Sequence, residues 1–170
     1  MRYSQSTEIA LESLFYMAAH TEANDFSVEQ LAQAQNVSAS YLAKVLQQLV
    51  KAGLLRSHRG SRGGYALSRS PAQISLRDIA LVFEGTSPLY ACNALSKRCD
   101  AGPRCILLAT FAEAERKMHD VLAQVSLQDV VDRTAASAGW VGASSSNGSV
   151  NAVISQEPVK LESAPVRIMV

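Results

Sequence analysis

Three cysteines lie close together in the sequence: Cys92, Cys99 and Cys105, separated by six and then by five residues. Their number is odd, so a disulfide framework fits poorly, whereas a metal site or reactive thiols fit better. The closely paired cysteines of structural zinc sites are absent. Thiolates spread over a loop that contains Gly102 and Pro103 suit an iron–sulfur cluster, whose irons are bound at separate corners. Spacing alone leaves two hypotheses open, an iron–sulfur cluster and thiol redox chemistry.

A second group of residues with a chemical use is basic. Between Gln30 and Arg77 the chain holds seven Lys or Arg residues and no Asp or Glu, although its formal net charge is only +1. This local excess predicts a basic face that contacts phosphates, as in nucleic-acid-binding proteins. An ordinary solvated surface is the alternative interpretation.

The elements that must position the basic residues form a predicted helix-turn-helix. A first helix is expected over about residues 7–20 and a second after Ser27, where Ser27 and Gln30 make a capping box. A third helix is predicted over 39–51, with Ser38 as its N-cap. Its apolar residues repeat at helical spacing and are Leu42, Val45, Leu46 and Leu49. Two helices joined by so short a turn are typical of a helix-turn-helix.

A hairpin should follow the third helix. Strand-like residues at 54–56 and 65–67 flank a glycine-rich loop with two cations at its tip, Arg59 and Arg62. A hairpin in this place is a wing, so the predicted fold is mainly α with a small β wing, a winged helix-turn-helix. The residues expected to contact DNA are Ser38, Ala39, Ser40, Tyr41 and Lys44 on the third helix, Lys51 and Arg56 at the DNA backbone, and Arg59 and Arg62 on the wing.

The C-terminal half is predicted to make a dimer. After a fourth helix over about 75–83 and the cysteine loop, a long helix carries a heptad pattern at Leu107, Phe111, Ala114, Met118, Val121 and Val125. A short helix should then end near Arg133. The expected division is a DNA-binding domain at 1–85, a cysteine loop and dimerisation helix at 86–134, and a disordered tail at 135–170.

Two function classes receive no support from the sequence. No apolar run is long enough to span a membrane and no signal peptide is visible, so a cytoplasmic protein is expected. No nucleophile elbow, zinc-protease motif or phosphate-binding loop occurs, so the chain is predicted not to be an enzyme. A cysteine-dependent enzyme and a winged-helix adaptor that binds only protein remain as alternatives.

Four segments match a known family: MRY at 1–3, VSASYL at 37–42, GLL at 53–55 and RGSRGGYAL at 59–67. With the three-cysteine loop, they make the chain resemble the Rrf2 family of bacterial winged-helix regulators over about residues 1–134. The resemblance implies a homodimer joined by the long helix and bound to a partly palindromic operator. It also implies that Cys92, Cys99 and Cys105 bind an iron–sulfur cluster with two or four irons.

The chain departs from this family at the fourth cluster ligand. The biogenesis regulators carry a histidine three residues after the last cysteine, where this chain has Leu108. In the nitric-oxide-sensing branch an acidic residue of the partner subunit completes the site, and Glu8 occupies the matching position. The alternative role for Glu8 is to complement the positive end of its own helix. The spacing of the cysteines also leaves an iron-responsive rhizobial branch open.

The predicted function is therefore that of a sequence-specific DNA-binding transcriptional regulator, a repressor. Its DNA binding would be controlled by an iron–sulfur cluster that senses iron or cluster status, redox conditions or nitric oxide. A cluster-free, thiol-based redox sensor of the same fold is the alternative.

Overall fold

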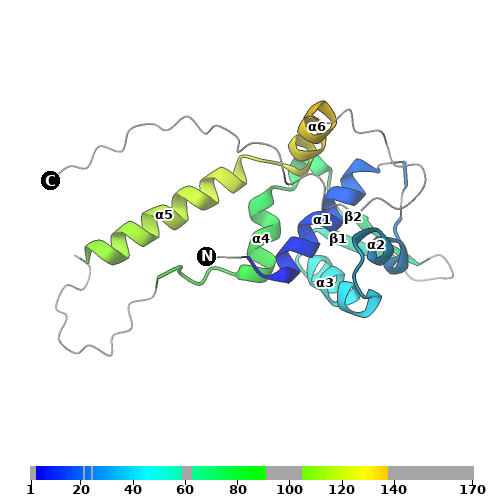
Figure 1. The fold of residues 1–170 in the computed structure, drawn as a ribbon, viewed down its shortest axis with the longest axis horizontal. Coiled ribbons are helices and arrows are strands. Elements are labelled where there is room, and N and C mark those ends of the chain that lie inside the picture. The colour runs from blue at the N-terminus through cyan, green and yellow to red at the C-terminus, as the bar shows by residue number, and fades with distance from the viewer. Residues whose placement is uncertain (1–2, 21, 24, 59–62, 91–104, 138–170) are drawn as a thin grey trace.

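The computed structural model describes residues 3–20, 22–23, 25–58, 63–90 and 105–137, and Figure 1 shows their arrangement. The elements follow in the order α1 (Gln5–Ala19), α2 (Val28–Gln35), α3 (Ala39–Lys51), β1 (Leu55–His58), β2 (Gly64–Leu67), a 3₁₀ turn η1 (Pro71–Gln73), α4 (Leu76–Glu84), α5 (Ile106–Ala123) and α6 (Leu127–Ser137). The mainly helical fold with a two-stranded wing is the one that the sequence predicts.

The helix ends lie where short polar side chains can cap them. Ser27 and Gln30 form the predicted capping box of α2, and Ser38 caps α3 by accepting from the backbone N–H of Tyr41. The first helix begins two residues earlier than predicted, because Ser4 is its N-cap and accepts from the N–H of Thr7. Gly53, two residues after the last residue of α3, has a positive φ of 72°, which favours glycine.

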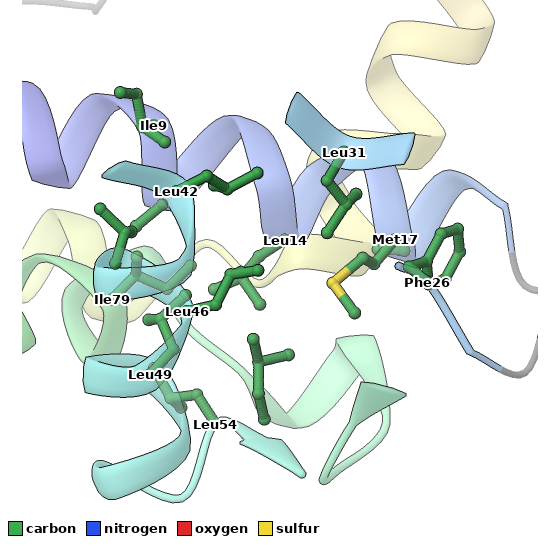
Figure 2. Packing of buried hydrophobic residues seen from close by; sticks show 14 of the residues in the cluster. Ile9, Leu14, Met17, Phe26, Leu31, Leu42, Leu46, Leu49, Leu54 and Ile79 are labelled. Atoms are coloured by element: carbon green, nitrogen blue, oxygen red, sulfur yellow. The ribbon is translucent and has the colours of Figure 1, made fainter. Parts of the chain in front are cut away.

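One apolar core joins the first four helices and the wing. Figure 2 shows Leu14 of α1, Leu31 of α2 and Leu46 of α3 converging in this core. The predicted apolar repeat of α3 is buried in full, at Leu42, Val45, Leu46 and Leu49. Burial of the whole repeat fixes the rotation of α3 about its axis and leaves its polar side in solvent.

The wing is anchored to the segment that precedes α2. Strands β1 and β2 pair antiparallel, with Leu55 opposite Leu67 and His58 opposite Gly64. Phe26 makes a further bridge to Tyr65, through backbone hydrogen bonds of 2.9 and 2.8 Å. A Cβ atom at Gly64 would lie 3.0 Å from the carbonyl oxygen of Phe26, so this close approach favours glycine. The loop tip at 59–62 lies outside the described residues.

Helix α6 packs on the N-terminal half of the chain. The N–H of Leu127 donates to the carbonyl of Ile74, and the N–H of Leu76 donates to that of Val125, both at 2.9 Å. Leu127 is buried in the common core, and α6 contacts α1 and η1. The segment predicted to group with the dimerisation helix thus contributes to the core of the first domain. The helix also continues to Ser137, four residues beyond its predicted end.

Helix α5 extends away from this body (Figure 1) and has no buried residue along its length. Four of its large apolar side chains are exposed: Ile106 by 75%, Leu107 by 54%, Phe111 by 43% and Val121 by 55%. Such a row of apolar side chains in solvent indicates a surface for another polypeptide. Among the described residues, no helix is both long and apolar enough to cross a lipid bilayer. The predicted tail lies outside the described residues from position 138 onward.

A carboxylate joins the beginning of α1 to the end of α4. Glu84 accepts from the backbone N–H of Ser4 at 2.8 Å and from the hydroxyl of Thr7, which is fully buried. Hydrogen bonds from Thr7 and then from Ser4 hold the pKa of Glu84 below its usual value of 4.5. The ionised form of Glu84 therefore stabilises the folded chain.

These hydrogen bonds to Glu84 predict a specific pH dependence of the stability of the folded chain. Because the folded-state pKa of Glu84 is lowered, its contribution is present above about pH 5 and is lost as the pH falls through the folded-state value. Glu84→Gln should have a lower melting temperature than the wild type near neutral pH, and the difference should narrow towards about pH 3. Thermal unfolding followed by circular dichroism measures it. Glu12→Gln, at an exposed carboxylate of α1, is the control, and a constant difference across pH would contradict the role of Glu84.

Candidate nucleic-acid interface and cysteine site

Helices α2 and α3 form the predicted helix-turn-helix. The turn between them begins at Asn36, which ends α2 in the left-handed conformation with φ 54° and ψ 43°. Asparagine tolerates this conformation because its short polar side chain can hydrogen-bond locally. The N–H of Val37 then donates to the carbonyl of Ala32 at 3.0 Å, and Ser38 begins α3. The short turn leaves the polar side of α3 free to meet a ligand.

The exposed side of α3 is polar and basic. Four exposed residues recur at helical spacing and lie on one face: Ser40, Lys44, Gln47 and Lys51. None of them is acidic, and the leucine-rich core lies behind them. Serine, lysine and glutamine can bind base edges or phosphates in a DNA groove. This face is therefore a candidate surface for reading DNA.

Some of the predicted DNA-contacting residues also have roles within the chain. The hydroxyl of Ser38 caps α3, and Ala39 packs partly against the core. The hydroxyl of Tyr41 lies 2.9 Å from the hydroxyl of Ser6 on α1, and its ring packs at the edge of the core. Ser40 and Lys44 are also exposed, and the hydroxyl of Ser40 lies 3.5 Å from that of Ser38.

The predicted cations of the wing lie only in part within the described residues. Arg56 is exposed on β1, the strand that follows α3 and packs against it. Arg59 and Arg62 fall in the loop tip, outside the described residues, so their role stays a prediction. The neighbouring His58 lies 3.3 Å from Asp25, which ties the base of the wing to the segment before α2.

Gln47 and Ser6 were missed by the sequence analysis. Gln47 could have been found from the period of α3, because it is three residues beyond Lys44 and away from the buried leucines. A glutamine can bind adenine through two hydrogen bonds. Ser6 carries no such signal, since its partner Tyr41 is 35 positions away in the sequence.

Of the three predicted cluster ligands, only Cys105 lies within the described residues. It is the N-cap residue of α5, it is half-buried, and its side chain makes no capping hydrogen bond. Cysteine sulfur is the protein ligand that the irons of an iron–sulfur cluster usually bind. Cys92 and Cys99 fall in the segment 91–104, outside the described residues. Position 105 therefore suits a thiolate ligand.

The described chain before Cys92 runs along α5 towards Cys105. The N–H of Leu89 donates to the carboxylate of Glu115 at 3.4 Å, and the next residue, Tyr90, stacks on Phe111 with ring centroids 4.8 Å apart. These two contacts step towards the N-terminus of α5, where Cys105 lies. The chain thus approaches the end of α5 that carries the third cysteine.

Glu8 is exposed in the first turn of α1. The segment that leads into α1 lies beside the C-terminal half of α5, where the hydroxyl of Tyr3 donates to the sulfur of Met118 at 3.7 Å. Met118 follows Cys105 by thirteen positions, about 20 Å along a helix. The described geometry of one chain does not bring Glu8 and Cys105 together.

Comparisons with known proteins agree on one family. Residues 3–133 match the Rrf2 family, described as an iron-dependent transcriptional regulator. The chain is 30% identical over 132 residues to the transcriptional regulator NsrR of Shouchella clausii, covering 77% of this chain and 89% of NsrR.

Solved structures show the same likeness. The structure of T. potens IscR matches with a TM-score of 0.63 and 25% identity, covering 79% of this chain and 88% of IscR. The structure of CymR, the global cysteine regulator of B. subtilis, matches with a TM-score of 0.61 and 27% identity, covering 78% of this chain and 98% of CymR.

The exposed cations of α3 lead to a measurable prediction. When Ala replaces both Lys44 and Lys51, the slope of log affinity against log salt should become less steep. The change should be about one unit for each phosphate that is no longer neutralised. Fluorescence anisotropy with a labelled DNA duplex of mixed sequence, titrated at several salt concentrations, measures the slope. Lys117→Ala is the control, because Lys117 pairs with Glu113 on α5, away from α3. An equal slope in all three proteins would remove this face of α3 from the interface.

Proposed function

Since the chain belongs to the Rrf2 family of transcriptional regulators, we propose that it is a repressor whose binding to operator DNA is controlled by an iron–sulfur cluster. The cluster would be held by Cys92, Cys99 and Cys105 of one chain and by Glu8 of a second chain. DNA would be read by the exposed face of α3 and by the wing.

The observation that carries this proposal is the path of residues 89–90 along α5. Phe111, on which Tyr90 stacks, is six residues beyond Cys105, or about 9 Å along the helix. Cys92 follows Tyr90 by two positions, and this length of chain can span up to about 7 Å. If the chain continues in this direction, Cys92 approaches the end of α5 where Cys105 lies, and a cluster could bridge the remaining distance between the two sulfurs.

The described donor fits an iron–sulfur cluster. Iron–sulfur clusters bind thiolates, and Cys105 offers a half-buried sulfur at the positive end of an 18-residue helix. Its sulfur does not cap the helix, so ligation would break no hydrogen bond of the described chain. When bound, the cluster would supply a centre that small oxidants, nitric oxide or iron loss can alter.

A dimer would supply the fourth ligand. Glu8 cannot reach Cys105 of its own chain if the start of α1 stays beside Met118. The exposed apolar row on α5 offers the surface for a second copy, since Leu107, Ala114 and Val121 recur every seven residues and are all exposed. A carboxylate is a weaker ligand for iron than a thiolate, so such a site could exchange its ligand during signalling.

A second candidate function is a thiol-based sensor without a cluster. The likeness to CymR, a global cysteine regulator, favours it. In that case a thiol oxidant would oxidise Cys105, at the start of α5, directly.

Protein purified without oxygen separates the two candidates. The proposal expects a coloured protein with visible absorption, iron and acid-labile sulfide, and Cys92→Ala, Cys99→Ala and Cys105→Ala should each lose most of all three. Glu8→Ala should retain a cluster with an altered spectrum and a shorter lifetime in air.

The matched control for Glu8 is Glu12→Ala, which removes an exposed carboxylate one helical turn later. If Glu8→Ala and Glu12→Ala show the same spectrum, lifetime and response to nitric oxide, Glu8 serves only its own helix end. A colourless wild type whose operator binding changes with a reversible thiol oxidant would support the cluster-free sensor instead.

The proposed dimer is tested on α5. Val121→Glu would place an unpaired charge in the interface, so the dimer dissociation constant should rise at least about tenfold, and affinity for a two-half-site operator should fall with it. Val121 is preferred to Met118, which contacts Tyr3 of its own chain. Ala112→Glu, on the opposite face of α5, should leave the dimer unchanged. Sedimentation velocity measures the states, and a dimeric Val121→Glu would exclude this face.

A further inference from the structure

The first turn of α1 is joined to two other helices by its short polar side chains. Ser4 and Thr7 bind the carboxylate of Glu84, the last residue of α4. Ser6, between them, shares a hydrogen bond with Tyr41 of α3. One helical turn thus contacts both the helix that leads into the cysteine segment and the helix that would read DNA.

The contact with α3 is made at the end of that helix nearest the predicted base contacts. Tyr41 lies in the first turn of α3, next to the exposed Ser40, and its backbone N–H is capped by Ser38. The hydroxyl oxygens of Tyr41 and Ser6 are 2.9 Å apart. Tyr41 is partly buried, so its side chain is held between the core and α1. A movement of the first turn of α1 would therefore displace Tyr41 and, with it, the neighbouring Ser38 and Ser40.

The contact with α4 is made just before the cysteine segment. Glu84 is followed by Gly85, whose φ of 67° suits glycine. From there the chain continues to Leu89 and Tyr90, which contact α5 on the way to Cys92. Thr7, which Glu84 binds, is fully buried and immediately precedes Glu8, the residue proposed as the partner's ligand.

We propose that Tyr41 is a positioning residue, which couples the state of the cysteine site to the recognition helix through its hydrogen bond with Ser6. This inference rests on the proposed function. The first turn of α1 carries Glu8 and is bound by Glu84, so a change of ligand at the cluster shifts this turn. The hydrogen bond between Ser6 and Tyr41 then transmits the shift to the N-terminus of α3. Tyr41 acts on DNA through the placement of Ser38 and Ser40.

The test compares the wild type with Ser6→Ala, Tyr41→Phe and the double variant. Each substitution removes one hydroxyl and keeps the remaining shape, and thermal unfolding confirms that each variant is folded. The dissociation constant is measured for a duplex selected by the wild type from a random pool. It is measured for cluster-loaded protein prepared without oxygen and for protein freed of cluster by a chelator. The quantity compared is the ratio of the two constants.

We expect the ratio to differ from one in the wild type and to move towards one by about threefold to tenfold in each single variant, the range that one hydrogen bond supports. The double variant should match the singles, because both substitutions break the same bond. Lys51→Ala is the control. It removes an exposed cation from the last turn of α3, away from Ser38 and Ser40, and it should weaken both forms equally and leave the ratio unchanged.

Three results would overturn the inference. A ratio that stays at the wild-type value in Tyr41→Phe and Ser6→Ala shows that the bond carries no coupling, while the proposed function stands. A change in only one of the two variants shows that the hydroxyls do not act as a pair. A ratio of one in the wild type shows that the cluster does not control DNA binding, so the proposed function fails and this inference fails with it.

Discussion

Burial of the leucine face of α3 is the interaction on which the rest of the structure depends. Leu42, Leu46 and Leu49 are fully buried among residues of α1, α2 and the wing. Each buried side chain of this size contributes about 1.5–3 kcal/mol through removal of apolar surface from water. The same burial fixes the rotation of α3, so its opposite face, which carries Lys44, must lie in solvent. Stability and the presentation of the candidate DNA-binding surface therefore have one physical cause.

The core also decides how the two ends of the chain meet. Leu127 of α6 is buried with Leu14 of α1, and a short antiparallel bridge joins Ser75 to Ser126. Helix α6 is anchored in the core, whereas α5 begins at a point away from the core and runs back towards α6 (Figure 1). The apolar row of α5 therefore lies in solvent. The described part of a single chain thus leaves an apolar surface uncovered, and the proposed dimer would cover it.

Much of this architecture could be predicted from local sequence signals. The caps at Ser27 and Ser38 act within a few residues of themselves, and the structure shows both. The beginning of α1 could not be placed in this way, because Ser4 and Thr7 can both cap a helix, and the bond from Thr7 to the distant Glu84 decides between them. For the site, the sequence indicated the exposed face of α3 and Cys105, since periodicity and residue type are local properties.

The sequence by itself determined the winged helix-turn-helix, its basic face and the close spacing of the three cysteines, because these depend on positions along the chain. Only the tertiary structure decided how Tyr41 is used. Its position at the start of α3 predicts contact with DNA, yet its hydroxyl is paired with Ser6. The tertiary structure also placed the start of α1 beside Met118 and the residues before Cys92 along α5. These contacts join residues far apart in the sequence, and no periodic pattern encodes them, because they form only when the helices pack.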